Sequence, residues 1–247
     1  MSGCYVQKVA QPIVTLAGFM AVLLLLATGI VYQKGAIDLM QAFNLLRIGA
    51  LLGIAGAGFT IFFILWQRPQ GINLAVIAAS ALLGIVAFYI PYREMLLVQR
   101  LPAIHDITTD IDDPPAFVTI ARVRVAAQNS VEYDGPETAA LQRETYPDIR
   151  TVVFDYGANE VFNAALRALD ELGWRVVEAS SEEGRIEATV SSRWFALKDD
   201  VVMRLRPAAG GMTEFDMRSK SRIGVSDAGA NARHIRRFIA EMNDELN

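Results

Sequence analysis

The sequence predicts an α+β protein in which a three-helix transmembrane region precedes an antiparallel sheet domain covered by two helices, in a helix-grip-like arrangement. Three observations lead to this fold class. Residues 1–90 contain five charged side chains, whereas residues 91–247 contain 19 basic and 26 acidic ones. The first part holds three long apolar segments. The last hundred residues alternate between short β-branched runs and amphipathic helical periods. A region suited to lipid therefore precedes a region suited to water.

Each apolar segment is long enough to cross a bilayer, which takes about 20 residues of helix. The segments cover residues 13–32, 48–66 and 72–90, and none contains Asp, Glu, Lys, Arg or His. Aromatic side chains lie near their ends, where amphipathic rings favour the membrane interface. We therefore predict a multi-pass transmembrane region over residues 1–92, with the lipid bilayer as its partner.

The second segment carries Gly49, Gly53 and Ala57 at every fourth residue. This spacing leaves one helix face without bulk and allows another helix to approach closely. Two interpretations follow. The face packs inside the protein's own bundle, or it contacts a larger integral membrane complex.

Residues 93–150 are predicted to form a connector and an irregular segment. The stretch "HDITTDIDDPP" joins adjacent aspartates to paired prolines, which disfavour a helix. Its carboxylates do not follow the spacing of a calcium-binding loop, and no cysteine and histidine spacing suits zinc. The sequence therefore predicts no metal site.

Residues 151–247 are predicted to form the soluble α+β domain. Strands are expected at 151–156, 174–181, 185–197, 200–207 and 213–219, because these runs are rich in β-branched and aromatic residues. Helices are expected at 158–173 and from Asp227 or Gly229 to Leu246, each with one apolar stripe. Short turns join most of the strands, which favours one antiparallel sheet with both helices on the same face.

Known catalytic patterns are missing from the sequence. It contains two histidines, His105 and His234, and has no nucleophile elbow, P-loop or dinucleotide fingerprint. No catalytic residue and no cofactor are therefore predicted. Asp199 and Asp200 are the acids on which a hydrolase or transferase would depend, although paired aspartates also suit a turn. The net charge of −7 over residues 91–247 argues against a nucleic-acid partner.

The stretch "RSKSRIGVSDAGANARHI", residues 218–235, combines basic side chains with the residues of a helix start. One interpretation is a site for an anion such as a lipid head group, since a helix N-terminus presents free N–H groups. The other is structural: Ser226 or Asp227 caps the helix, and Arg222 pairs with Asp227. The candidate binding residues are Arg218, Lys220, Arg222, Ser226, Asp227, Asn231 and Arg233.

Several of these motifs resemble the family called domain of unknown function 1499, found in bacteria and plastids. The resemblance rests on "HDITTDIDDPPAF", "YPDI", "GWRVV", "DDVVMRLR" and "RSKSRIGVSDAGANARHIRRF", and it covers roughly residues 102–246. The three-helix region resembles the proteobacterial version. No catalytic residues are established for the family, so the resemblance assigns none. Relatives that look like exported lipoproteins or thylakoid-lumen proteins imply a soluble domain on the periplasmic side.

We therefore expect a non-enzymatic protein of the bacterial inner membrane, whose soluble domain engages an envelope component or a membrane complex. The charges near the segments instead favour a cytoplasmic domain. Four basic residues lie on the side of the soluble domain, and two lie on the amino-terminal side. We follow the resemblance, because such a small excess is easily reversed. An accessory structural subunit of a larger membrane complex, and an enzyme acting on lipid or cell-wall material, are the alternatives.

Overall fold

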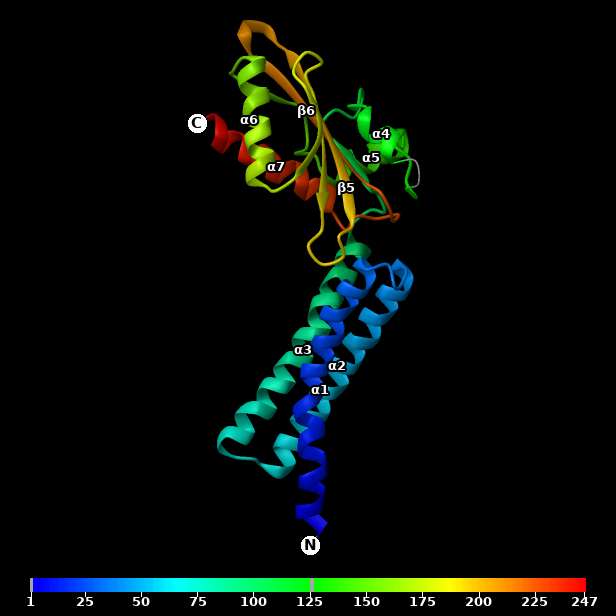
Figure 1. The fold of residues 1–247 in the computed structure, drawn as a ribbon, viewed down its shortest axis with the longest axis vertical. Coiled ribbons are helices and arrows are strands. Elements are labelled where there is room, and N and C mark those ends of the chain that lie inside the picture. Colours follow the sequence, from blue (N-terminus) through cyan, green and yellow to red (C-terminus); the bar gives the residue numbers. More distant parts are fainter. Residues whose placement is uncertain (1, 125–126) are drawn as a thin grey trace. The chain divides into compact units, whose positions relative to one another are not determined.

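The computed structural model describes residues 2–124 and 127–247 of the chain (Figure 1). The chain divides into two compact units. The first is Met1–Leu96 with Arg193–Phe195, and the second is Leu97–Ser192 with Ala196–Asn247. Each unit has its own architecture.

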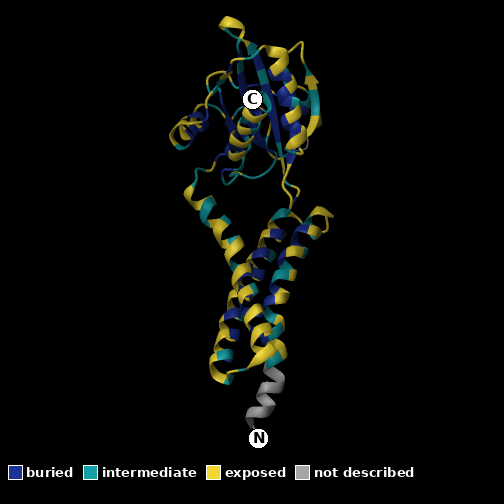
Figure 2. Cartoon of the chain, turned by 90° about the vertical axis from the view of Figure 1, so that its left-hand side faces the viewer, coloured by how far each residue is buried: buried dark blue, intermediate teal, exposed yellow. Residues whose placement is uncertain are grey.

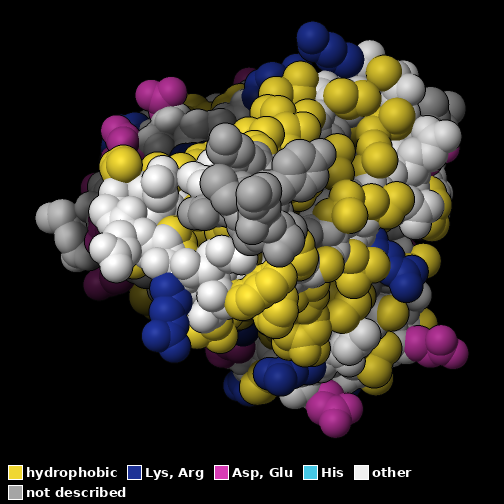
Figure 3. Space-filling view, turned by 90° about the horizontal axis from the view of Figure 1, so that it is seen from below, with side chains coloured by type: hydrophobic (Ala, Val, Ile, Leu, Met, Phe, Trp, Pro, Cys, Tyr) yellow, Lys and Arg dark blue, Asp and Glu magenta, His cyan; other side chains and the backbone are white. Residues whose placement is uncertain are grey.

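The first unit contains three long helices, α1 (Ser2–Gln33), α2 (Leu39–Gln67) and α3 (Gly71–Arg100). All three are long and apolar enough to cross a membrane, and each contains one predicted segment. Asp38 begins α2 through a capping box, in which its side chain accepts from the Gln41 N–H at 2.8 Å. Narrow buried stripes run along helices whose other faces are exposed (Figure 2). The space-filling view shows hydrophobic side chains over much of the face that it displays (Figure 3). Exposed apolar faces of this kind suit contact with lipid.

The second unit is an α+β domain, which confirms the predicted fold class. Its elements in chain order are β1 (Asp106–Thr108), α4 (Thr119–Val123), α5 (Pro136–Thr145), β2 (Val152–Phe154), α6 (Ala158–Glu171), β3 (Arg175–Ser180), β4 (Arg185–Ser191), β5 (Lys198–Pro207), the 3₁₀ turn η1 (Ala209–Gly211), β6 (Thr213–Ser221) and α7 (Ala230–Leu246).

The strands form one antiparallel sheet in the order β1-β6-β5-β4-β3, and β2 also pairs with β6. The two short strands share the outer edge of β6. β1 pairs with its end, where Asp106 lies opposite Lys220, and β2 pairs with its start, where Phe154 lies opposite Thr213. Short turns join β3 to β4 and β5 to β6, as predicted, whereas residues 192–197 separate β4 from β5.

Both α6 and α7 cover one face of the sheet, with α4 and α5 on the other side (Figure 1). The main core lies between the sheet and the helices α6 and α7. It includes Leu169, Met203, Phe215, Ile235 and Phe238, all with no exposed surface. A smaller apolar cluster on the other face contains Phe117, Ile120 and Val202. The second face is therefore also covered.

Residues 93–150 differ from the predicted irregular connector. Their first residues continue α3 to Arg100, and the rest contribute β1, α4 and α5 to the second unit. The sheet consequently has six strands and not five. Short elements of this kind are held by partners distant in sequence, which local periodicity does not report. The predicted strand 185–197 is also shorter, because the chain turns after Ser191 and Ala196 adopts a left-handed φ of 50°.

Candidate functional site

The face of the sheet away from α6 and α7 carries a layer of buried charges, which we call the charged layer. Arg218, Lys220 and Arg222 alternate along β6 and its end, so all three side chains reach this face. Their carboxylate partners are Asp106, Asp134 and Asp200. The charged layer therefore uses three of the predicted binding residues, but inside the fold.

Arg218 forms the most complete pair of the layer. Its Nε and Nη2 donate to the two oxygens of Asp106, each at 2.8 Å. The guanidinium also lies 5.1 Å from the ring centre of Phe117 and 5.4 Å from that of Tyr133. Burial raises the pKa of the Tyr133 hydroxyl to about 12, so that ring stays neutral. Two hydrogen bonds and two aromatic faces hold this arginine in one place.

Lys220 is fully buried beside the same carboxylate. Its Nζ lies 3.1 Å from Asp106 Oδ2 and 2.6 Å from Asp134 Oδ1, and it also donates to the Glu132 carbonyl. A buried ammonium needs partners of this kind, because leaving it unpaired costs several kcal/mol.

Asp200 is the second centre of the charged layer, and it has no exposed surface. Arg222 donates to both of its oxygens at 2.8 Å, and Arg124 lies 3.2 Å from Oδ2. The Thr189 hydroxyl donates to Oδ1 at 2.8 Å. Burial lowers the pKa of Arg124, and the charge of Asp200 opposes that change. Arg222 thus pairs with Asp200, and the predicted pair with Asp227 is not formed.

A third cluster lies at the other end of the layer. Arg204 and Arg206 both contact Asp216, at 3.1 and 3.0 Å, and both reach Asp110. Burial favours the neutral acid at Asp110. Even so, N–H groups of Asp113 and Asp112 and the two arginines hold the pKa of this carboxyl below its usual value. Asp106, Asp110 and Asp113 of "DITTDIDD" therefore bind arginines.

Glu187 anchors the segment that covers the layer. Its carboxylate accepts from the N–H groups of Val118, Thr119 and Ile120 at 2.8, 3.0 and 2.6 Å, and it pairs with Arg185. These N–H groups begin α4, so a side chain from β4 caps that helix. The sequence offered no signal for this contact, because the partners are more than 60 residues apart.

The loop before α7 is held by its own residues. Asp227 accepts from the Gly229 N–H at 2.7 Å and the Asn231 N–H at 2.8 Å, while Ser226 has one 3.4 Å contact with the Ala228 N–H. Asp227 is thus the main cap, and its carboxylate occupies the anion position at the helix N-terminus. Asn231 is buried and donates to the His105 carbonyl at 3.0 Å. Arg233 donates to the Ala228 carbonyl and stays exposed.

The structure separates the seven candidate residues into two groups. Arg218, Lys220 and Arg222 lie on the charged layer, whereas Ser226, Asp227, Asn231 and Arg233 lie at the start of α7. The predicted site did not include two acids of the layer, Asp106 and Asp134, or the basic residue Arg124. Arg218, Lys220 and Arg222 are two residues apart, which places three cations on one face of a strand. Buried cations need acidic partners, so this spacing could have predicted buried acids nearby.

Asp199 lies on the other face of β5 from Asp200, toward α7. Its Oδ2 is 3.7 Å from Nδ1 of His234, and that nitrogen is buried without a hydrogen-bond partner in the described residues. Burial raises the pKa of Asp199 to about 6. Burial, then Arg233 and Arg237, lower the pKa of His234 to about 4. The two predicted acids are thus in different environments and do not act as a pair.

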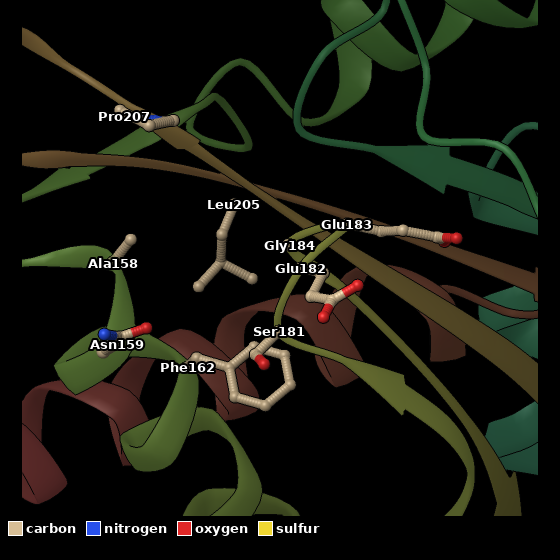
Figure 4. A pocket seen from close by; sticks show the side chains of 9 residues that line it. All are labelled: Ala158, Asn159, Phe162, Ser181, Glu182, Glu183, Gly184, Leu205 and Pro207. Atoms are coloured by element: carbon tan, nitrogen blue, oxygen red, sulfur yellow. The ribbon is translucent and has the colours of Figure 1, made fainter.

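A hollow in the second unit lies between α6, the turn after β3 and the end of β5 (Figure 4). Its volume is about 240 Å³. It is lined by Ala158, Asn159, Phe162, Ser181, Glu182, Glu183, Gly184, Leu205 and Pro207. A second hollow of about 280 Å³ lies over the charged layer, between the Pro114–Pro115 segment and Arg185 and Arg204. Neither hollow is lined by Asp199 or Asp200.

Within the first unit, Gly49, Gly53 and Ala57 all lie on the buried side of α2. A methyl group added to Gly53 would meet the Gly84 carbonyl of α3 at 2.7 Å, and one on Gly49 would meet Leu24 of α1 at 3.3 Å. Ala57 is 1 % exposed. These residues therefore let α2 pack closely against α1 and α3.

Among the described residues, no group of three or more His, Cys, Asp or Glu side chains is placed to hold a metal ion. Among curated proteins, none is significantly similar to this chain. One family model matches residues 106–242, from the first strand to the last helix of the second unit. That match covers more than half of the chain and includes both the charged layer and the loop before α7. The chain therefore belongs to the DUF1499 family of proteins of unknown function.

Proposed function

We propose that the protein is a binding or accessory protein, without catalytic activity, anchored in the bacterial inner membrane by α1, α2 and α3. In this proposal the second unit lies in the periplasm and engages an envelope component or a neighbouring membrane complex. The resemblance to exported relatives supports the periplasmic side.

The observation that carries the proposal is the pairing of the charged side chains. Asp106, Asp200, Arg218 and Lys220 are buried, and each pairs with an oppositely charged side chain, so none is available as an acid, a base or a ligand. A layer locked in this way makes a rigid domain. Rigid domains suit recognition, because little conformational entropy is lost on binding.

The hollow beside α6 is the best place for such recognition. Phe162, Leu205 and Pro207 give it an apolar wall, and Asn159 and Ser181 bring polar groups to its edge (Figure 4). Binding pockets typically combine an apolar lining with a few placed polar groups. At about 240 Å³ the hollow fits a small chemical group.

Native mass spectrometry of the full chain, released from native membranes in mild detergent, tests this proposal. Ala158→Trp would fill the hollow, whereas Glu160→Trp, on an exposed position of the same helix, would not. We expect a bound molecule or partner with the natural chain and with Glu160→Trp, and its loss with Ala158→Trp. A solitary chain carrying nothing in all three samples would contradict the proposal.

The alternative of an accessory structural subunit has less support. The docking face predicted for such a subunit consists of Gly49, Gly53 and Ala57. These residues contact helices of the same chain. A subunit would therefore have to dock through another surface.

A further inference from the structure

Asp199 of β5 and His234 of α7 face each other in the interior of the second unit. Their side chains are 15 % and 20 % exposed, and Oδ2 of Asp199 lies 3.7 Å from Nδ1 of His234. That separation is too long for a hydrogen bond. Nδ1 is buried and has no hydrogen-bond partner in the described part of the chain. Two polar groups therefore meet between the last helix and the sheet without bonding to each other.

The carboxylate of Asp199 has little to stabilise its charge. As far as the structure describes the chain, no lysine or arginine lies within ion-pair distance of it. Burial raises the pKa of this carboxyl to about 6, and the charges of Asp227 and Asp200 add to the effect. The Ser221 hydroxyl, which hydrogen-bonds to the carboxylate, and the more distant Arg124 act in the opposite direction. A carboxyl group in these surroundings gains a proton more readily than one in water.

His234 is also poorly placed to carry a charge. Burial, then Arg233 and Arg237 of the same helix, lower the pKa of its imidazole to about 4. The ring packs against Trp174 in a T-shaped arrangement, with the ring centres 5.5 Å apart, and this neighbour supplies no charge. A neutral imidazole keeps a lone pair on one ring nitrogen, which can accept a hydrogen bond. The neutral ring thus offers an acceptor beside a carboxyl group that readily gains a proton.

The two groups complement each other once a single proton is present. An ionised carboxylate only accepts hydrogen bonds, whereas a protonated carboxyl group has an O–H to donate. We propose that Asp199 and His234 form a proton-dependent contact between β5 and α7, in which the carboxyl group takes one proton from mildly acidic solution and donates it as a hydrogen bond to Nδ1. Both side chains keep some exposed surface, so solvent protons reach them. The last helix is then joined to the sheet by a bond that it lacks at neutral pH.

Nitrogen-15 NMR of the full chain, with labelled histidine, tests this contact. The chain has two histidines, His105 and His234, so His234→Gln assigns the signals. As the pH falls from neutral, we expect the Nδ1 signal of His234 to move from that of a free acceptor to that of a hydrogen-bonded one, with a midpoint near pH 6. A signal that stays constant until the ring itself titrates near pH 4, or an Nδ1 already protonated at neutral pH, would overturn the proposal.

Asp199→Asn separates the proton from the shape of the side chain. Its carboxamide carries N–H groups at every pH, so the His234 signal should show no step near pH 6. Asp148→Asn is the matched control: it removes an exposed carboxylate of the same unit and should leave the step in place. A step that persists in Asp199→Asn, or that disappears in Asp148→Asn, would show that Asp199 is not the source of the proton. The titration of the natural chain decides the question even where a variant does not fold.

Discussion

Arg218 and Asp106 form a two-bond ion pair in the interior of the second unit, with both N···O distances at 2.8 Å. Their exposed side-chain fractions are 3 % and 0 %, and 112 residues separate them in the chain. The pair fastens the segment that follows α3 to the last strand of the sheet. A buried pair of this kind is costly to break, because the remaining charge stays in the interior without a partner.

Asp106→Asn should therefore destabilise the second unit strongly. The change leaves Arg218 without its carboxylate and removes one of the two acids beside Lys220, so we expect a loss of about 3–5 kcal/mol in the free energy of unfolding. Urea unfolding of the full chain in detergent would measure it. The fluorescence of the buried Trp174 reports the transition once Trp66 and Trp194 are replaced by phenylalanine.

The exposed pair of Arg236 and Asp148 is the matched control. It also has two hydrogen bonds, of 2.6 and 2.8 Å, but its side chains are 44 % and 55 % exposed. Arg236→Gln should cost no more than about 1 kcal/mol, since water solvates both charges once they separate. Similar losses for the two variants would mean that burial does not set the strength of the Arg218 pair.

The longer elements of the fold could be predicted from the sequence, whereas the short ones could not. The helices and the four longer strands each carry their own periodicity, so they were expected at nearly the right residues. β1 has three residues and exists only because β6 pairs with it, and α4 begins where Glu187 supplies a distant cap. Interactions of this kind are absent from any local window, which is why residues 93–150 looked irregular.

In the candidate site, contacts between neighbours in the chain could be predicted, and contacts between distant residues could not. Ser226 or Asp227 is predicted to cap α7, because capping depends on neighbours in the chain, and the structure identifies Asp227 as the main cap. The partner of Arg222 was misassigned to that aspartate, since Asp200 approaches it only across paired strands. The predicted strand 213–219 also ended too early, so Lys220 was placed in a loop instead of on β6.

The cap of α7 gives a second prediction. Asp227→Ala should reduce the free energy of unfolding by about 1 kcal/mol, because two N–H groups at the start of the helix lose their acceptor. Ser226→Ala should have almost no effect, since its single contact is 3.4 Å long. The same urea titration compares them. A larger effect from Ser226→Ala would identify the serine as the cap.

The contact between α2 and α3 gives a third prediction. Gly53→Leu should lower the thermal stability of the detergent-solubilised chain, because even the first carbon of the new side chain would meet the Gly84 carbonyl at 2.7 Å. Overpacking of this kind costs about 1–3 kcal/mol. At Gly58, on the same helix, the first side-chain carbon would meet nothing within 4 Å, so Gly58→Leu should not lower stability. An equal loss in both variants would show that helix packing is not the cause.

Asp199 and His234 should respond to pH in opposite directions. Burial raises the pKa of Asp199 to about 6, so between about pH 4 and pH 6 the folded state holds more protons than the unfolded state, and stability falls as pH rises. Burial, then Arg233 and Arg237, lower the pKa of His234 to about 4. The unfolded state then holds more protons up to about pH 6.5, and this contribution to stability is lost as pH falls toward 4.

These opposing effects largely cancel in the natural chain, and single variants should reveal each one. His234→Gln leaves the aspartate alone, so stability should fall from pH 4 to pH 6 by up to about 1.4 kcal/mol per pH unit. Asp199→Asn leaves the histidine alone, so stability should rise from pH 4 to pH 6.5 and exceed that of the natural chain at pH 7. Urea unfolding across this range measures both slopes. Parallel profiles for the two variants would show that these groups do not titrate as their burial implies.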